Sequence, residues 1–364
     1  MAKRVGVDKW LFGVVLLLVL FGLVTVFSAS AVMAQASLGS PYPYVMKQAK
    51  WAVLGLLVMV WLMRVDYRRY NNPRVVFPAV AVTTLMLIGV FAVSGSHNTH
   101  RWVRFGDLFT FQPSELAKPV LVLFLAYFLQ TRIHQMDDWK GTILQAVAVP
   151  LAFTALILQE PDLGTGMVCM AVTALVLYLA GARAKYFAVG AAFAAPVMYY
   201  MLFHVKFRHD RMLAFINPEA DPKGTGFHIL QSLIAVGTGG IRGLGLMEGR
   251  QKLFYLPEVQ TDFIFANICE ELGLIGALLV VGLFVALGYR GLRAAFLSTD
   301  PFARFLAFGL TTAILIQAFF NMSVVLALLP TKGIPLPFIS SGGTSIFITL
   351  ASMGVLLNIT REID

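Results

Sequence analysis

The sequence has little charge and little cysteine for its length, and both shortages exclude broad classes of protein. Only 13% of its 364 residues are charged, whereas 58% are hydrophobic and the mean hydropathy is +0.78. A soluble domain has about a quarter of its residues charged, so a soluble fold is excluded. The two cysteines, Cys169 and Cys269, lie inside apolar runs. Without a CxxC pair or a loop cysteine, they indicate neither a disulfide framework nor a metal site.

Long hydrophobic runs are abundant instead. A helix that crosses a bilayer requires about 20 mostly apolar residues, whereas barrel strands show short alternating patterns. We therefore predict an all-α polytopic membrane protein, with residues 1–364 as one domain and about ten transmembrane helices. They are expected at residues 10–33, 50–63, 75–93, 113–130, 143–158, 163–181, 187–203, 263–288, 305–329 and 341–358.

Basic residues predict the orientation, because cytoplasmic loops are enriched in Lys and Arg. Most Lys and Arg of the short loops fall on one side if the N-terminus is cytoplasmic. The C-terminus is then also cytoplasmic, and the long segment 204–262, between the seventh and eighth spans, is extracytoplasmic. The net charge of +9 reflects this topology and does not indicate nucleic-acid binding. Because the outer face of a bacterial membrane has no ATP, a reaction there must draw energy from its substrate or from an ion gradient.

Two ionisable residues stand out near the start of the fourth span. A charged residue inside a membrane costs roughly 2.5–3.5 kcal/mol on insertion scales, so each one is a candidate for function. Glu115 and Lys118 are three residues apart and share one helix face, where they can pair. One interpretation is a neutralised structural pair between helices. The other is a cavity wall, in which Lys118 contacts an anionic group or an acidic partner such as Asp262.

The outer segments carry further candidates for binding an anion. Arg101 and Trp102 precede the fourth span; arginine binds phosphate well, and tryptophan is a common interface anchor. The segment 206–211 is basic and suited to anionic headgroups, and residues 226–235 resemble a short helix on the membrane surface. The glycine-rich segment 237–249 lacks a P-loop lysine. It is either a close-approach backbone or a flexible tether.

Asp262 lies where the long loop meets the eighth span. A carboxylate shielded from water there would have a raised pKa, which suits a general base. The alternative is an N-cap of the eighth helix, because aspartate is a favoured cap. Glu270 and Glu271 follow in the same run without an evident partner, and Lys332 lies in the outer segment before the last span. The residues alone do not separate an enzyme from a transporter.

Several stretches together resemble the SEDS (shape, elongation, division, sporulation) family, the FtsW and RodA proteins. They occur in the family's order and cover nearly all the predicted spans: Arg101-Trp102, 111–118, 161–165, 251–258, 261–266, 270–273, 329–333 and 337–343. The segments 251–253 and 27–30 look more like the division member of the family. Gln260 stands where the family often has histidine, so that position is not expected to carry an obligatory proton shuttle.

The resemblance implies a peptidoglycan glycosyltransferase that polymerises lipid II at the outer face of the cytoplasmic membrane. Asp262 matches the family's essential aspartate and would act as the base, with undecaprenyl pyrophosphate as the leaving group. The expected substrate-binding residues are Arg101, Glu115, Lys118, Glu258 and Lys332. No protein metal site is predicted, although a divalent cation, Mg²⁺ or Mn²⁺, is compatible with the leaving group.

The resemblance also implies partners. They are lipid II and the nascent glycan strand, a class B penicillin-binding transpeptidase, other division or elongation proteins, and membrane lipids.

A lipid II flippase and a non-catalytic division scaffold are the alternative functions. A transporter should have charges spread through the depth of the bundle and inverted repeats. The sequence shows no such repeat, and its charges cluster at the outer end, which favours the enzyme.

Overall fold

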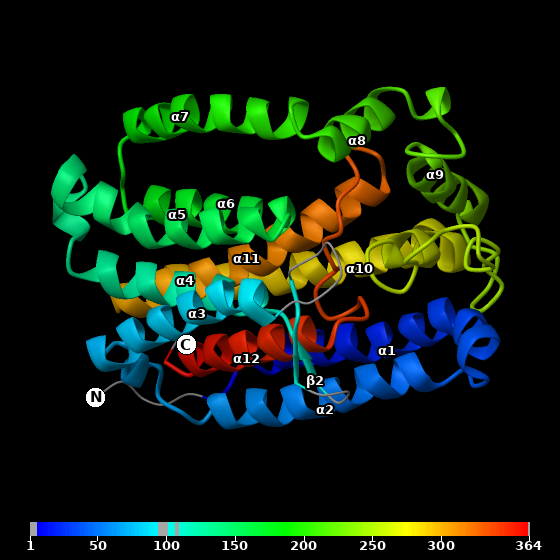
Figure 1. Cartoon of the computed structure of the whole chain (residues 1–364). Helices are drawn as coiled ribbons and strands as arrows, with labels where there is room; N and C mark the ends of the chain where they lie inside the picture. The colour runs from blue at the N-terminus through cyan, green and yellow to red at the C-terminus, as the bar shows by residue number, and fades with distance from the viewer. Residues whose placement is uncertain (1–5, 94–100, 106–108, 363–364) are drawn as a thin grey trace.

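The structure, a computed structural model, describes residues 6–93, 101–105 and 109–362. Lys3 and Arg4, which are among the basic residues that predict a cytoplasmic N-terminus, lie outside these residues, as does His100, which precedes Arg101. The described chain is a bundle of long helices with one short strand pair (Figure 1). This architecture follows from the apolar runs, because a helix satisfies all its backbone hydrogen bonds internally in lipid.

Ten helices coincide with the ten predicted ranges. They are α1 (Lys9–Leu38), α2 (Pro43–Leu62), α3 (Pro73–Val93), α4 (Pro113–Gln130), α5 (Leu144–Gln159), α6 (Leu163–Leu179), α7 (Ala184–Phe203), α10 (Ile264–Leu297), α11 (Pro301–Val325) and α12 (Gly343–Thr360). Eight helices of the described chain are long and apolar enough to cross a membrane, while α4 and the 17-residue α6 are not among them. An all-helical, multi-pass fold is therefore confirmed.

Shorter elements connect these helices. The helical turns are η1 (Tyr67–Tyr70), η2 (Ile133–Gln135), η3 (Trp139–Ile143) and η4 (Pro218–Ala220), and the two remaining helices are α8 (Lys206–Ile216) and α9 (Phe227–Gly239). Strands β1 (Val103–Phe105) and β2 (Phe109–Phe111) pair antiparallel, with Val103 opposite Phe111. The predicted short helix at 226–235 is α9, which packs against α10. The predicted long loop is therefore substantially helical.

Burial differs sharply among the helices. Helix α11 packs against α4, α6 and α10, and α12 packs against α2. Helix α7, by contrast, has no buried residue and lies apart from α5 and α6 at the top of the view in Figure 1. Such a helix satisfies its backbone internally and does not need protein neighbours on every face when lipid surrounds it.

Charged residues tie the chain together at one end of the bundle. Arg290 forms an ion pair with Asp8 at 2.6 Å, and Glu362 accepts hydrogen bonds from Tyr67 and Arg68 at 2.8 Å each. These contacts join the start of α1, the end of α12, η1 and the later part of α10. Helices α8 and α9 lie toward the opposite end of the bundle in Figure 1.

Helix α10 is interrupted at Gly273, whose φ of 63° and ψ of −159° are not helical. Glycine adopts such a conformation without steric penalty. The glycine-rich segment docks at this break: the amides of Leu244 and Gly245 donate to the carbonyls of Glu270 and Glu271 at 3.0 and 2.9 Å. In return, the amides of Leu274 and Ile275 donate to residues 240 and 241. The segment is thus a close-approach backbone, not a flexible tether, and the predicted span 263–288 is part of a longer, broken helix.

The two glutamates before the break, for which the sequence suggested no partner, are both satisfied. Glu270 accepts backbone hydrogen bonds from Arg250 and Gln251 at 2.9 and 3.2 Å. Glu271 pairs with Lys252 at 2.6 Å and accepts from the hydroxyl of Ser28 in α1 at 2.6–2.7 Å. Lys252 and Glu271 are 3% and 1% exposed. The long loop is therefore fastened to α1 and α10 by buried charge.

Replacing Lys252 with methionine should destabilise the protein strongly. The Glu271 carboxylate would remain buried without its cationic partner, and breaking a buried pair in this way costs about 3–5 kcal/mol. We expect a lower thermal midpoint in detergent for Lys252→Met. The matched control is Arg250→Met, because Arg250 is exposed and only its backbone amide bonds to Glu270. Equal midpoints for the two variants would contradict this prediction.

Candidate active site

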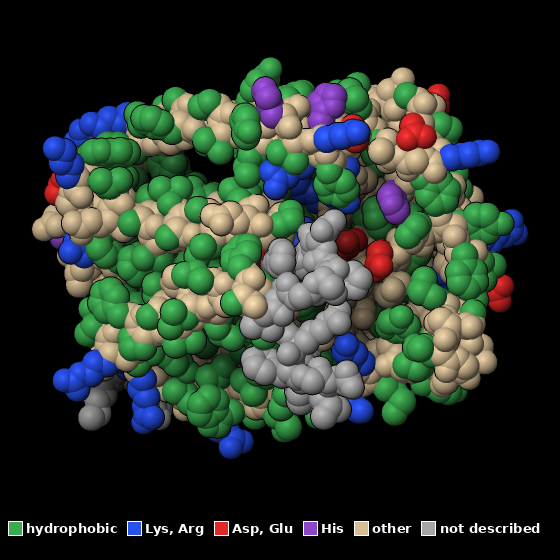
Figure 2. Space-filling model, viewed as in Figure 1, with side chains coloured by type: hydrophobic (Ala, Val, Ile, Leu, Met, Phe, Trp, Pro, Cys, Tyr) green, Lys and Arg blue, Asp and Glu red, His purple; other side chains and the backbone are tan. Residues whose placement is uncertain are grey.

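A cavity of about 680 Å³ lies beside the start of α10. Polar and apolar side chains line it together, and its ionisable lining residues are Arg101, Asp162, Arg208, Arg211, Asp262 and Lys332. Figure 2 shows a largely hydrophobic face on which acidic and basic side chains gather below α8. Four cations therefore face two carboxylates, and a cavity with this excess of positive charge suits an anionic ligand.

Asp262 has the environment of a tuned base. Burial and then the negative charge of Glu258 raise the pKa of the Asp262 carboxyl to about 7, against the opposing effect of Arg101. Among the described residues, none donates a hydrogen bond to this carboxylate. A carboxyl group with a pKa near neutral pH can both accept and release a proton there.

Asp262 does not cap α10, so the capping interpretation is wrong. The helix begins at Ile264, its N-cap is Phe263, and no side chain bonds to the free amides there. Aspartate caps a helix when it sits at the N-cap itself, and Asp262 is one residue too early. Asp162, in contrast, is the N-cap of α6 and accepts hydrogen bonds from the amide and hydroxyl of Thr165 at 3.1 and 2.8 Å.

The segment between α11 and α12 closes over Asp262. Ser340 donates to the carbonyl of Thr261 at 2.5 Å, and the Ser341 amide donates to the carbonyl of Gln260 at 2.8 Å. Gly333 lies so near that a Cβ on it would be 2.6 Å from Asp262 Oδ2. Two segments far apart in sequence are thus held together at the carboxylate.

Lys332 and two arginines of α8 provide the cavity's positive charge. Burial lowers the pKa of the Lys332 ammonium to about 7, and the charges of Arg208 and Arg211 oppose its protonation further. Burial also lowers the pKa of Arg211, with Arg101 adding repulsion. Arg211 donates a hydrogen bond to the carbonyl of Thr331 at 3.3 Å. The basic segment 206–211 was assigned to lipid headgroups from sequence, but two of its arginines face the cavity.

Arg101 lines the cavity, yet two of its guanidinium nitrogens, Nε and Nη2, already donate hydrogen bonds to the protein. It donates to the carbonyls of Glu160 at 2.9 Å and Pro161 at 2.5 Å. These bonds fix the turn that follows α5 and presents Asp162. Glu160 is fully buried, and burial with the neighbouring charge of Asp162 raises its pKa to about 8. Arg101 is therefore placed to shape the cavity wall as much as to bind a ligand.

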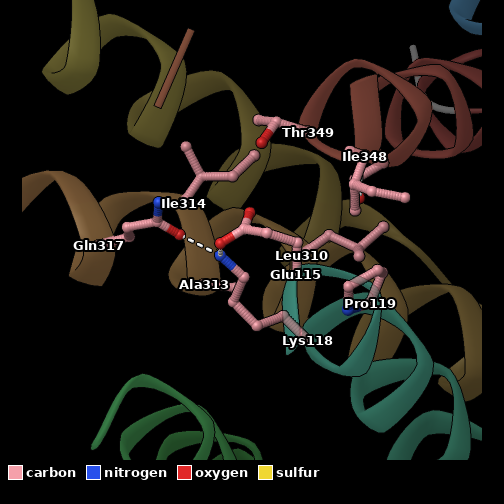
Figure 3. Close-up of a pocket in the computed structure, with 10 residues that line it drawn as sticks. Glu115, Lys118, Pro119, Leu310, Ala313, Ile314, Gln317, Ile348 and Thr349 are labelled. Atoms are coloured by element: carbon pink, nitrogen blue, oxygen red, sulfur yellow. Dashed lines mark hydrogen bonds and ion pairs between the residues drawn. The ribbon is translucent and has the colours of Figure 1, made fainter. Parts of the chain in front are cut away.

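Glu115 and Lys118 lie elsewhere. They pair at 2.9 Å on α4 and are 2% and 8% exposed. They line a second pocket of about 20 Å³, which holds one water at most. Figure 3 shows the Lys118 ammonium directed at the side-chain oxygen of Gln317 on α11, with which it bonds. The partners of Lys118 in the described chain are thus Glu115 and Gln317, and not Asp262.

Glu258 stands four residues before Asp262 in the same turn. Its backbone carbonyl accepts from the amide and hydroxyl of Thr261 at 3.1 Å each, and its carboxylate also accepts from that hydroxyl at 3.1 Å. Its φ of 53° lies in the left-handed region, which is uncommon for a residue other than glycine. Glu258 therefore shapes the turn that presents Asp262 and acts on it through its charge.

Comparisons with known proteins agree on one family. The FtsW/RodA/SpoVE family model, described as "Cell cycle protein", matches residues 8–364. "Probable peptidoglycan glycosyltransferase FtsW" of Geobacter metallireducens is 41% identical over 343 residues, 94% of this chain and 91% of the relative. "Stage V sporulation protein E" of Bacillus subtilis is 37% identical over 360 residues, 99% of this chain and 98% of the relative.

Solved structures show the same fold. A chain of the structure "Structural coordination of polymerization and crosslinking by a peptidoglycan synthase complex" superposes with a TM-score of 0.78 at 26% identity, covering 98% of this chain and 97% of that one. The Thermus thermophilus rod shape determining protein RodA superposes with a TM-score of 0.70 at 26% identity, covering 98% of both chains. The match of family, sequence and fold over nearly the whole length confirms the resemblance: this chain belongs to the FtsW/RodA/SpoVE family of cell cycle proteins.

Proposed function

We propose that this chain is a peptidoglycan glycosyltransferase that polymerises lipid II into glycan strands. The single observation that carries the proposal is the Asp262 carboxyl, with a pKa of about 7, in a cavity where cations outnumber carboxylates. A base and an anion site side by side fit a transfer in which a pyrophosphate leaves. The name of the Geobacter relative agrees with this chemistry.

The topology proposed with this function has ten spans in one domain, residues 1–364, within the bacterial cytoplasmic membrane. Both termini are cytoplasmic, and the segment 204–262 with Asp262 is extracytoplasmic. Support comes from the ten helices at the predicted positions and from the distribution of Lys and Arg. The activated lipid-linked donor then supplies the energy for a reaction on a face without ATP.

In the proposed reaction Asp262 accepts the proton of the acceptor sugar hydroxyl. The hydroxyl oxygen forms a bond to the anomeric carbon of the donor strand with inversion. The bond from that carbon to the phosphate oxygen breaks, and undecaprenyl pyrophosphate leaves with the electron pair. Lys332, Arg208 and Arg211 line the same cavity and would stabilise the negative charge that develops on the leaving group.

The other sequence candidates take supporting roles in this proposal. Arg101 shapes the cavity wall, and the charge of Glu258 adds to burial in raising the pKa of the Asp262 carboxyl. Glu115 and Lys118, remote from the cavity, act indirectly. In the described part of the chain, no three His, Cys, Asp or Glu residues group as ligands for Mg²⁺ or Mn²⁺. Such an ion often binds through one or two carboxylates and the phosphates of its substrate, and the proposed reaction includes no step on it.

We also propose a class B penicillin-binding transpeptidase as the partner, within the division machinery. A synthase complex among the similar structures supports such an assembly. The relative named FtsW is 41% identical to this chain and RodA is 26% identical, which favours division over elongation.

Polymerisation of labelled lipid II by purified protein in detergent tests the proposal, with and without the transpeptidase. Glycan ladders from the wild type are the expected result. Ladders from neither sample would contradict it and favour the flippase, which a vesicle flipping assay would then detect. A scaffold would be inactive in both assays.

Removing the α8 arginines should weaken substrate binding. For Arg208→Gln and Arg211→Gln together we expect the KM for lipid II to rise about 10²-fold or more, since each hydrogen bond to a charged group contributes about 1.5–3 kcal/mol. Lys206→Gln is the matched control, because Lys206 is on the same helix but exposed and outside the cavity lining. An unchanged KM in the double variant would remove these arginines from the binding site.

The pH dependence should report the charge of Glu258. The deprotonated Asp262 is the active form, so the rate should fall as pH drops through about 7. Glu258→Gln removes a negative charge that raises this pKa, and the acid limb of kcat/KM should therefore move to lower pH. Glu248→Gln is the control, because Glu248 is exposed and is not among the charges that shift the pKa of the Asp262 carboxyl. A limb that stays in place would mean that Glu258 does not tune the base.

A further inference from the structure

Two buried amides on α11 lie between the Glu115–Lys118 pair and the proposed catalytic base. Gln317 and Asn321 are four residues apart, so they share one face of the helix. They are 3% and 1% exposed. Burying an amide side chain costs free energy unless its groups are hydrogen-bonded. The hydrogen-bond partners of these two residues therefore indicate their role.

Gln317 joins the ion pair to the segment before α12. Its side-chain oxygen accepts from the ammonium of Lys118, as the dashed line in Figure 3 marks. Its side-chain nitrogen donates to the carbonyl of Pro335 at 2.9 Å. Since an amide oxygen only accepts and its nitrogen only donates, these two partners fix the orientation of Gln317.

Asn321 joins the same segment to the base. Its side-chain nitrogen donates to the carbonyl of Asp262 at 2.8 Å and to the carbonyl of Ile334 at 2.7 Å. Both amide hydrogens are therefore used on the two segments that carry Asp262 and Lys332. Its side-chain oxygen has no partner among the described residues, so Asn321 contacts these two segments only through its side-chain nitrogen.

We propose that Gln317 and Asn321 are positioning residues, which connect the Glu115–Lys118 pair to Asp262 and to the segment of Lys332. This inference rests on the proposed function. Neither amide lines the cavity of Asp262, so both act through other residues. On this basis Glu115 and Lys118 contribute to the reaction without contacting the substrate. Lys118 bonds to Gln317, and Gln317 bonds to Pro335. Asn321 bonds to Asp262 and to Ile334, which precedes Pro335 in the chain.

Conservative variants that remove only the hydrogen bonds test this connection. For Asn321→Leu we expect kcat to fall about 10²-fold, the loss that a displacement of about 1 Å can cause, with little change in KM. The displaced carboxylate should also meet more water, so the acid limb should move below pH 7. Thr311→Val is the matched control, because Thr311 is buried on the same helix and donates only to the carbonyl of Ala307.

A purely structural role predicts a different result. It would lower the yield of folded protein while leaving kcat per folded molecule and the acid limb unchanged, and that outcome would overturn the proposal. Gln317 provides a second test if Asn321→Leu does not fold. Gln317→Met removes the donor to Pro335 without adding a charge, so its kcat should also fall and its acid limb should move to lower pH.

A double-mutant cycle between Lys118→Met and Gln317→Met tests the first part of the connection. Residues that act through one another should give a double variant little worse than the poorer single one, whereas independent residues give additive losses. Additive losses would overturn the connection. If the wild type and Asn321→Leu form ladders at the same rate while Asp262→Asn forms none, this inference alone is refuted. Absence of wild-type ladders would refute the proposed function itself, whereas equal activity of wild type and Asp262→Asn would move the base to another residue.

Discussion

Glycan strands should no longer form when Asp262 is replaced by asparagine. The variant keeps the shape of the side chain but cannot accept the proton of the acceptor hydroxyl. General-base catalysis typically contributes about 10²–10⁴-fold, and kcat should fall by that amount while lipid II still binds. The measurement is the initial rate of ladder formation from labelled lipid II, together with the dissociation constant of a lipid II analogue.

Asp162→Asn provides the matched control for that experiment. Asp162 is the other carboxylate of the cavity lining, but its oxygens are occupied in capping α6. Asparagine caps a helix about as well as aspartate, so this variant should fold and form ladders. Its acid limb should move to lower pH, because the charge of Asp162 also raises the pKa of the Asp262 carboxyl. If Asp262→Asn still forms ladders at the wild-type rate, the base lies elsewhere, and Glu258 is the next residue to replace.

A methyl group on Gly333 should be nearly as damaging. In Gly333→Ala the new Cβ would lie 2.6 Å from Asp262 Oδ2, well inside van der Waals contact, so the carboxylate must move. A misplacement of about 1 Å can cost about 10²-fold, and we expect kcat to fall by that factor. The same kinetic assay, performed on the monodisperse fraction, measures it.

Gly237→Ala is the control for Gly333→Ala. A Cβ on Gly237 meets nothing within 4 Å, and alanine is favoured over glycine inside a helix. The control should therefore keep wild-type activity and at least wild-type stability. A Gly333→Ala protein with full activity would show that the segment can yield and that the close approach to Asp262 is not required.

The helices could be predicted from sequence because lipid leaves the backbone few choices. Ten apolar runs gave ten helices near the expected positions, since each run satisfies its own hydrogen bonds. The break at Gly273 was not predicted, because its stability comes from a segment thirty residues earlier in the chain. The partners of Glu270 and Glu271 were missed for the same reason: backbone amides and Lys252 reach them only after that segment docks.

The site was predictable to a lesser degree. Asp262 and Lys332 emerged from two separate family motifs, 261–266 and 329–333, that share an outer location, and they do line one cavity. Arg208 and Arg211 did not emerge, because charges in a long polar loop are expected on its surface. Gln317 and Asn321 offered a signal that could have been used: polar residues four apart in an apolar helix point inward to a partner. What the sequence could not supply is which carbonyls they bind.

The break in α10 has a consequence for exchanging parts between members of the family. The carbonyls before Gly273 and the amides after it find their partners in residues 240–245. A chimera that takes only the outer loop, or only α10, from a relative would pair two segments with different sequences. Backbone amides and carbonyls at the break could then lose their hydrogen-bond partners. Residues 237–275 should therefore be transplanted as one block, and Ser28 of α1, which bonds to Glu271 within that block, should be matched to it.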